Sequence, residues 1–177
     1  MATQPVFEKP ISVEEYLSTA YEPDYEYVDG AIEERNVGEL DHSFLQLFLG
    51  SIFMNRRAEW GIVSFSEQRI QIGPNRFRIP DLAVVRSDFK REPILTHPPL
   101  LVIEIQSPED TLRRTTIKAA EYLAFGIEHI WVIDPTARVV YRGTANGLEL
   151  IRSGEMSIPG TPIRVSAQEL FAELDRV

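Results

Sequence analysis

Two hydrophobic periodicities alternate along the chain, and together they divide it into helices and strands. Ser12 is followed three residues later by Glu15, a capping box that predicts a short helix over residues 12–19. An Asp-Gly pair at positions 29–30, between two extended runs, is the strongest local signal for a β-hairpin. Apolar residues at three- and four-residue spacing then predict a second helix over residues 42–57.

From residue 62 onward the spacing of apolar residues changes to two, which predicts β-strands. Alternation at residues 70–72, a Gly-Pro-Asn turn at 73–75 and a further apolar run predict a strand and its return strand over 77–85. Residues 100–106 are nearly all apolar, as expected for a strand that other elements cover on both faces.

The last part of the chain repeats the alternation of helix and strand. Ser107 before Pro108 predicts an N-cap, and Gly126 ends the helix that we expect between residues 108 and 125. A last short helix follows three further strands, which we expect at 130–133, 139–141 and 148–151. No Gly/Ser-rich linker and no internal repeat interrupts this order. We therefore expect a single α/β domain over residues 1–177, with a mixed β-sheet flanked by helices.

Composition narrows the class of protein. With 44% hydrophobic and 25% charged residues, the chain of 177 residues has the make-up of a folded globular domain. It contains no cysteine, so any metal must be bound by oxygen or imidazole. There is no apolar run of membrane-spanning length and no signal-peptide pattern in the first residues. We therefore expect a cytoplasmic protein that does not enter a membrane.

The net charge of −9 conceals an uneven distribution of charge. Residues 1–55 hold 2 basic and 11 acidic side chains, residues 56–118 hold 11 basic and 8 acidic, and residues 119–177 hold 5 basic and 8 acidic. The three segments thus carry −9, +3 and −3. Because the middle segment is basic, the net charge does not exclude binding to DNA. The acidic flank predicts that this binding is weak or non-specific without a metal and sensitive to salt.

Two carboxylates stand in apolar surroundings, where an ionised group must be paired, protonated or bound to a cation. Asp81 precedes a Leu-Ala-Val-Val run, and Glu104 lies inside the strand predicted at 100–106. Because strand side chains alternate, Glu104 and Gln106 are expected on the same face. Carboxylates from two adjacent strands make a hard-oxygen site suited to Mg²⁺ or Mn²⁺, which activates water and offsets the charge of a phosphate.

The spacing of these residues resembles the PD-(D/E)XK signature of phosphodiesterases, because Pro80-Asp81 is followed by Glu104-Ile105-Gln106, and Glu104 comes 23 positions after Asp81. Over residues 12–142 the chain also resembles one bacterial family, the restriction-endonuclease-like proteins called Uma-two. The matching positions are Tyr25 to Gly30, His42, Arg78 to Val85, Pro98 to Pro108, Lys118, Tyr122, Gly126, Ile127 and Trp131 to Pro135.

This resemblance implies a restriction-endonuclease-like fold and a divalent cation held by Asp81 and Glu104. It also implies that Lys118 replaces, from the following helix, the lysine that the general motif carries two residues after the glutamate. That strand position is Gln106 here, which can orient a water but adds no positive charge. In this interpretation Lys118 positions the attacking water and stabilises the phosphate charge.

The two carboxylates also have structural interpretations. Asp81 could cap the turn that follows Pro80, and Glu104 could be the buried partner of Arg78 or Arg114. Neither interpretation needs a metal.

The cationic and secondary candidates are equally open to two interpretations. The apolar stripe of the predicted third helix lies opposite Lys118, which favours a solvated lysine, yet Lys118, Arg114 and Tyr122 share a face that could line a cleft. Glu26 could add an acidic group to the cleft or be an exposed hairpin residue. His42 could deprotonate water or bind phosphate, or it could cap a helix or make a simple polar contact.

On this basis the sequence favours a metal-dependent endonuclease that acts on DNA. The alternative is a catalytically inactive nucleic-acid- or protein-binding module of the same fold, which the missing strand lysine favours. We also expect a homodimer. A purely structural role as an oligomer subunit would rest on Tyr21, Tyr25 and Tyr27, interpreted as exposed aromatic residues.

Overall fold

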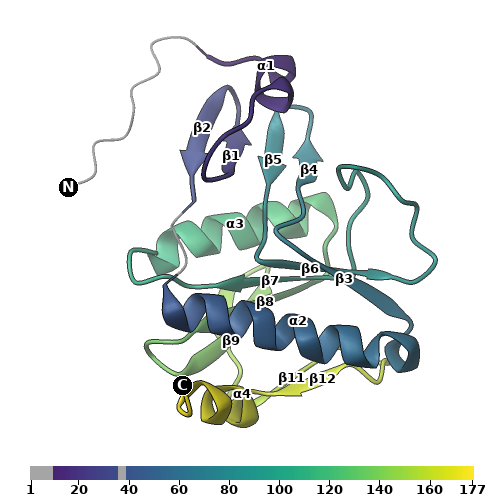
Figure 1. The fold of residues 1–177 in the computed structure, drawn as a ribbon, viewed down its shortest axis with the longest axis vertical. Helices are drawn as coiled ribbons and strands as arrows, with labels where there is room; N and C mark the ends of the chain where they lie inside the picture. Colours follow the sequence, from purple (N-terminus) through teal and green to yellow (C-terminus); the bar gives the residue numbers. More distant parts are fainter. Residues whose placement is uncertain (1–9, 36–38) are drawn as a thin grey trace.

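The computed structural model of the chain describes residues 10–35 and 39–177, and Figure 1 shows their helices and strands. None of the described helices is long and apolar enough to cross a membrane. The elements are α1 (Val13–Ser18), β1 (Tyr25–Val28), β2 (Ala31–Glu34), α2 (Leu40–Trp60), β3 (Ile62–Ser66), β4 (Ile70–Gly73), β5 (Arg76–Arg78), β6 (Leu82–Arg86), β7 (Leu101–Ile105), α3 (Leu112–Phe125), β8 (His129–Asp134), β9 (Val139–Thr144), β10 (Gly147–Leu150), β11 (Glu155–Ser157), β12 (Arg164–Ser166) and α4 (Ala167–Leu174).

A six-stranded mixed sheet with the order β10-β9-β8-β7-β6-β3 forms the centre of the protein. Its strands β7 and β8 run parallel, and the other neighbouring strands are antiparallel. α2 packs on one face through Leu45, Leu49 and Phe53, and α3 packs on the other through Ala119 and Tyr122. The expected mixed sheet flanked by helices is therefore confirmed, and β7 is covered on both faces.

A smaller four-stranded sheet, β2-β1-β5-β4, lies beside α3 at the top of Figure 1. Its apolar cluster consists of Ile11, Tyr16, Tyr27 and Phe77. Since Tyr27 is only 3% exposed and Tyr21 and Tyr25 are half-buried, the interpretation of these tyrosines as an exposed aromatic surface is wrong. Their rings pack into the small sheet because aromatic pairs bury large apolar areas.

The predicted helix caps and the predicted hairpin turn, which depend on residues close together in the sequence, are confirmed. The Ser12 hydroxyl accepts a hydrogen bond from the Glu15 amide at 3.1 Å at the start of α1. β1 and β2 form the expected hairpin, and its turn residues at positions 29–30 both have positive φ. At the start of α4, the Ser166 hydroxyl accepts from the Glu169 amide at 3.2 Å. These contacts satisfy backbone donors that a helix end would otherwise leave free.

The prediction of one continuous return strand over residues 77–85 is wrong, and the difference matters for the site. The chain forms two strands, β5 and β6, which belong to different sheets and are separated by Ile79, Pro80 and Asp81. Pro80 has no N–H to donate to a sheet, so the ladder ends there. Asp81 therefore stands at the point where the chain passes from the small sheet into the large one.

The third helix begins later than the Ser107-Pro108 signal predicts. The Asp110 carboxylate accepts from the Ser107 amide at 2.8 Å, and the Asp110 amide donates to the Ser107 carbonyl at 2.9 Å. This local turn competes with helix formation. The N-cap is Thr111, whose hydroxyl accepts from the Arg114 amide at 3.2 Å.

Candidate active site

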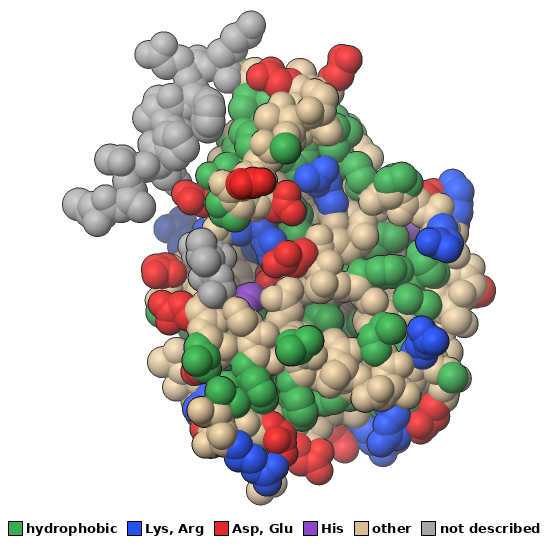
Figure 2. Space-filling model, viewed as in Figure 1, with side chains coloured by type: hydrophobic (Ala, Val, Ile, Leu, Met, Phe, Trp, Pro, Cys, Tyr) green, Lys and Arg blue, Asp and Glu red, His purple; other side chains and the backbone are tan. Residues whose placement is uncertain are grey.

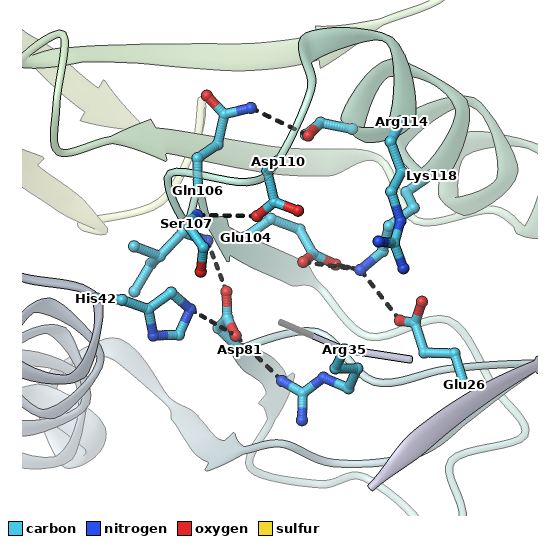
Figure 3. Close-up of a pocket in the computed structure, with 12 residues that line it drawn as sticks. Glu26, Arg35, His42, Asp81, Glu104, Gln106, Ser107, Asp110, Arg114 and Lys118 are labelled. Atoms are coloured by element: carbon cyan, nitrogen blue, oxygen red, sulfur yellow. Dashed lines mark hydrogen bonds and ion pairs between the residues drawn. The ribbon is translucent and has the colours of Figure 1, made fainter. Parts of the chain in front are cut away.

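Acidic and basic side chains lie close together between the small sheet and α2, on the face shown in Figure 2. They surround a cavity of about 50 Å³, drawn in close-up in Figure 3. Its walls come from β1, the chain after β2, α2, the start of β6, β7 with the turn after it, and α3. The lining residues are Glu26, Arg35, His42, Asp81, Glu104, Ile105, Gln106, Ser107, Asp110, Arg114, Thr115 and Lys118.

Asp81 is held in a fixed orientation at the base of this cavity. Its Oδ2 accepts a hydrogen bond from the Ile105 amide of β7 at 2.6 Å. Its Oδ1 lies 3.2 Å from Arg35 Nη2 and 3.2 Å from His42 Nε2. The carboxylate thus joins β6 to β7 and directs one oxygen toward two groups that can carry positive charge.

Glu104 points from β7 into the same cavity. It accepts hydrogen bonds from Lys118 Nζ at 2.9 Å and from the Tyr122 hydroxyl at 2.6 Å. An arginine partner for Glu104 is therefore not observed, and that interpretation is wrong. Burial raises the pKa of Glu104, the charge of Lys118 lowers it, and Asp81 and Glu26 raise it again, with a net increase. The site holds more negative charge than its lysine alone balances.

The two arginines considered as partners of Glu104 are bound elsewhere. Arg78 pairs with three other carboxylates, those of Glu26, Glu33 and Glu121, at 2.6–2.8 Å. Arg114 donates to the Glu34 carbonyl oxygen at 2.9 Å. These contacts fasten the small sheet to α3.

Lys118 reaches the cavity, and the expectation of a solvated lysine is wrong. Its side chain is 12% exposed, and Nζ lies 2.9 Å from Glu104 Oε1 and 3.0 Å from Glu26 Oε1. Helical periodicity failed because the buried face of α3 runs through Thr115, Ala119 and Tyr122, beside Lys118, whereas the apolar Ala120 and Ala124 are exposed. Burial lowers the pKa of Lys118, but Glu104 and Glu26 raise it further, so the amine stays charged.

Tyr122 and Gln106 support these side chains. Burial, together with nearby Glu104, raises the pKa of Tyr122 well above 10, so its hydroxyl remains a donor. Gln106 lines the cavity on the same side as Glu104, as strand alternation predicts. Its amide donates to the Thr115 hydroxyl at 3.1 Å, so Figure 3 shows it turned toward α3.

Glu26 is fully buried, and the alternative of an exposed hairpin residue is wrong. Its Oε2 accepts from Arg78 Nη1 at 2.8 Å, and its Oε1 accepts from the Ile79 amide at 3.0 Å. Burial would raise the pKa of Glu26, but the charges of Lys118 and Arg78 and the Ile79 hydrogen bond lower it to about 2. Glu26 is therefore ionised and holds Lys118 toward the cavity.

The low pKa of Glu26 predicts a specific acid sensitivity. A group with a depressed folded-state pKa adds stability above its ordinary pKa of 4.5, and this stability is lost as the pH falls toward about 2. We expect the gap in unfolding free energy between the native chain and Glu26→Gln to narrow from pH 5 to pH 3, measured by urea unfolding. A gap that does not change with pH would contradict this assignment.

Arg35 and His42 complete the cavity. Arg35 also approaches Glu67 at 3.4 Å, and no motif marks it. His42 does not cap α2, because the N-cap is Glu39. Burial lowers the pKa of His42, but the hydrogen bond to Asp81 and the charge of that carboxylate together raise it, with a net increase. Nδ1 of His42 is buried and has no hydrogen-bond partner among the described residues.

Two carboxylates of the cavity, those of Asp81 and Glu104, are the candidate ligands for a metal ion. No group of three or more His, Cys, Asp or Glu side chains within residues 10–35 and 39–177 is arranged to hold a metal. Asp81 and Glu104 nevertheless present hard carboxylate oxygens to one cavity. Mg²⁺ is commonly held by one or two carboxylates, with waters completing its shell. The residues therefore fit the chemistry of Mg²⁺ or Mn²⁺ better than that of a softer metal.

Comparison with known proteins agrees with the fold and the family. The Uma2 family model, described as "Putative restriction endonuclease", matches residues 13–168. The chain belongs to the Uma2 family. This confirms the resemblance seen in the sequence, and it supports a function of the restriction-endonuclease-like class. No curated protein matches the chain.

A solved structure shares the fold. It is described as the crystal structure of "a putative nuclease belonging to DUF820 from Anabaena variabilis ATCC 29413". It superimposes with a TM-score of 0.79 at 23% sequence identity, and the alignment covers 93% of this chain and 99% of that one. The two proteins therefore share a fold over almost the whole of this chain.

Proposed function

We propose that this Uma2 protein is a metal-dependent endonuclease that hydrolyses phosphodiester bonds in DNA. The observation that carries the proposal is the meeting in one cavity of Asp81 from the link before β6, Glu104 from β7 and Lys118 from α3. Two fixed carboxylates beside a charged amine are the groups that phosphoryl transfer needs for a cation and for the developing phosphate charge.

Each residue has a role that follows from its contacts. Asp81 and Glu104 would hold Mg²⁺ or Mn²⁺, which when bound lowers the pKa of a water and offsets phosphate charge. Lys118 keeps its proton and faces the reacting phosphate with a positive charge. Tyr122 orients Glu104 through its 2.6 Å hydrogen bond. His42 orients Asp81, and Gln106 ties the end of β7 to α3 through Thr115.

The size of the cavity restricts the kind of substrate. Pockets that enclose a whole small molecule measure about 300–1,000 Å³, and this cavity, at about 50 Å³, is far smaller. A whole nucleotide cannot enter, so the substrate would present a single phosphate at the mouth while the rest lies across the surface. Arg35 and Arg114 line the same cavity and can contact phosphate oxygens there. A polymer backbone such as DNA meets this requirement.

Plasmid cleavage tests the proposal. We expect the purified chain to convert supercoiled plasmid to the nicked form with Mg²⁺ or Mn²⁺ and to stop when EDTA is added. Because binding to DNA depends on Lys and Arg contacts with phosphates, which salt weakens, the rate should fall steeply with salt. Cleavage that persists in EDTA would count against the metal-dependent reaction.

Arg35 provides a second prediction, which concerns the metal alone. Its guanidinium lies 3.2 Å from Asp81 Oδ1, so a cation at that oxygen must compete with it. We expect Arg35→Gln to tighten Mn²⁺ binding by about tenfold in calorimetry, because one positive charge leaves the site. Arg86→Gln, remote from this cavity on β6, is the matched control and should leave the affinity unchanged. Equal affinities for all three proteins would show that Arg35 does not compete with metal at Asp81.

One observation favours the second candidate, an inactive nucleic-acid- or protein-binding module. Asp81 and Glu104 already have cationic partners, Arg35 and Lys118, so their charges are compensated by the protein itself. In that case the carboxylates only hold the sheets and helices together. Calorimetry separates the candidates, because an inactive module should bind DNA while failing to bind Mn²⁺ at millimolar concentration.

A further inference from the structure

The helix α2 has an apolar face that no described part of the chain covers. Its inner face is fully buried through Leu45, Leu49 and Phe53. On the outer face, Leu40, Leu47 and Met54 are 65%, 76% and 44% exposed. Figure 1 shows α2 running across the front of the molecule, and Figure 2 shows hydrophobic side chains gathered over the same region. Exposed apolar patches of this kind mark interaction surfaces.

The three exposed side chains follow a strict seven-residue spacing. Two helical turns take 7.2 residues, so positions 40, 47 and 54 form one nearly straight stripe along α2. Phe44 and Phe48 stack beside this stripe, with ring centroids 5.8 Å apart and planes within 8°. Residues seven apart occupy every second position of the 3.5-residue repeat by which one helix packs along another.

We propose that this stripe, Leu40, Leu47 and Met54, is the interface of a homodimer in which α2 pairs antiparallel with α2 of a second copy. A two-fold axis at Leu47 places Leu47 against its own copy. It also places Leu40 against Met54 of the second copy, because each lies seven residues from the axis. The surface is therefore complementary to itself, as a closed two-fold dimer requires.

The charges at the two ends of α2 agree with the antiparallel arrangement. Glu39 and Arg57 are exposed, and within the described residues neither side chain makes an ion pair. They are 18 residues apart, which is five complete helical turns, so both lie on the same flank of the stripe.

In the antiparallel dimer, Glu39 lies eight residues before the axis and Arg57 of the second copy lies ten residues after it. The two are offset by about 3 Å along the helix, within reach of their side chains. Symmetry creates this ion pair twice. A parallel dimer would instead bring Glu39 against Glu39 and Arg57 against Arg57, which is unfavourable.

The proposed dimer leaves both candidate active sites open. His42 precedes Leu47 by five residues, which is 500° of helix rotation and therefore about 140° from the stripe. His42 indeed faces Asp81 at 3.2 Å, on the inner side of α2. Each cavity would thus remain accessible at its own end of the paired helices. The dimer does not depend on whether the cavity is catalytic.

Sedimentation equilibrium of the full chain over a concentration series tests the proposal. We expect a dimer for the native chain and a monomer for Leu47→Glu, because a charge would lie on the axis against its own copy. Ile117→Glu is the matched control, since Ile117 is 50% exposed on α3, away from this stripe. It should remain a dimer.

A charge exchange distinguishes this interface from any other. Glu39→Arg or Arg57→Glu alone should raise the dissociation constant about tenfold, since each breaks both rim pairs. The double variant should restore the native dissociation constant. This test does not require the Leu47→Glu protein to fold. A native chain that is monomeric throughout, equal effects of the Leu47 and Ile117 variants, or no recovery in the double variant would overturn the proposal. Thermal melting by circular dichroism establishes that each variant is folded.

Discussion

Asp81→Asn is expected to reduce Mg²⁺-dependent plasmid cleavage by about 100-fold or more. The substitution replaces a charged oxygen ligand by a neutral amide in a site where Oδ1 faces the cavity. It keeps the size of the side chain, and the amide oxygen can still accept the 2.6 Å hydrogen bond from the Ile105 amide. The loss should therefore arise from the missing charge and should be accompanied by loss of Mn²⁺ binding in calorimetry.

Asp134→Asn is the matched control for Asp81→Asn. Asp134 is also a strand-end aspartate of the large sheet, but its carboxylate accepts from the Ala137 amide outside the cavity. The control should cleave plasmid at the native rate. If Asp81→Asn cleaves equally well, the observed activity comes from a contaminant or from another site, and Asp81 is not part of the machinery.

Lys118→Met should have the largest effect on stability, about 3 kcal/mol at neutral pH. It removes a cation between two buried carboxylates, and breaking a buried pair leaves uncompensated charge. Adding Glu104→Gln should recover part of the loss, because Glu104 is the carboxylate left without a cationic partner, whereas Glu26 keeps Arg78. Cleavage should fall as well, because the charge that faces the phosphate is gone. Urea unfolding and the plasmid assay measure the two effects separately.

Lys90→Met provides the comparison for Lys118→Met. Lys90 also pairs with a glutamate, Glu92, but its side chain is 76% exposed, and a pair in water contributes little. Its unfolding free energy should stay within about 0.5 kcal/mol of the native value. Similar losses for both variants would mean that Lys118 is held by its aliphatic stem and not by its charge.

The fold could be anticipated from the sequence wherever the signal is local. Capping by Ser12 and Ser166 and the turn at positions 29–30 depend on neighbours three residues away or less, and each forms as expected. The break between β5 and β6 was missed, because the apolar run continues through Pro80 and only the existence of a second sheet explains it. The start of α3 was misplaced because Asp110 competes for the Ser107 backbone.

Part of the candidate site could be predicted from the sequence, and part could not. Asp81 and Glu104 are conspicuous because carboxylates in apolar strands are costly. The burial of Lys118 and Glu26 depends on the small sheet lying over α3, a tertiary contact that helical periodicity cannot report. Arg35 has no sequence signal beyond being a rare basic residue in the acidic first segment. Its place at Asp81 follows from the chain path after β2.

Anomalous diffraction from crystals soaked in Mn²⁺ tests the central claim most directly. The proposed function predicts one strong peak in the cavity, within about 2.2 Å of carboxylate oxygens of both Asp81 and Glu104, with Arg35 displaced from Oδ1. Soaked crystals that show no peak there, with Asp81 still bound to Arg35 and Glu104 still bound to Lys118, would contradict a metal-dependent site.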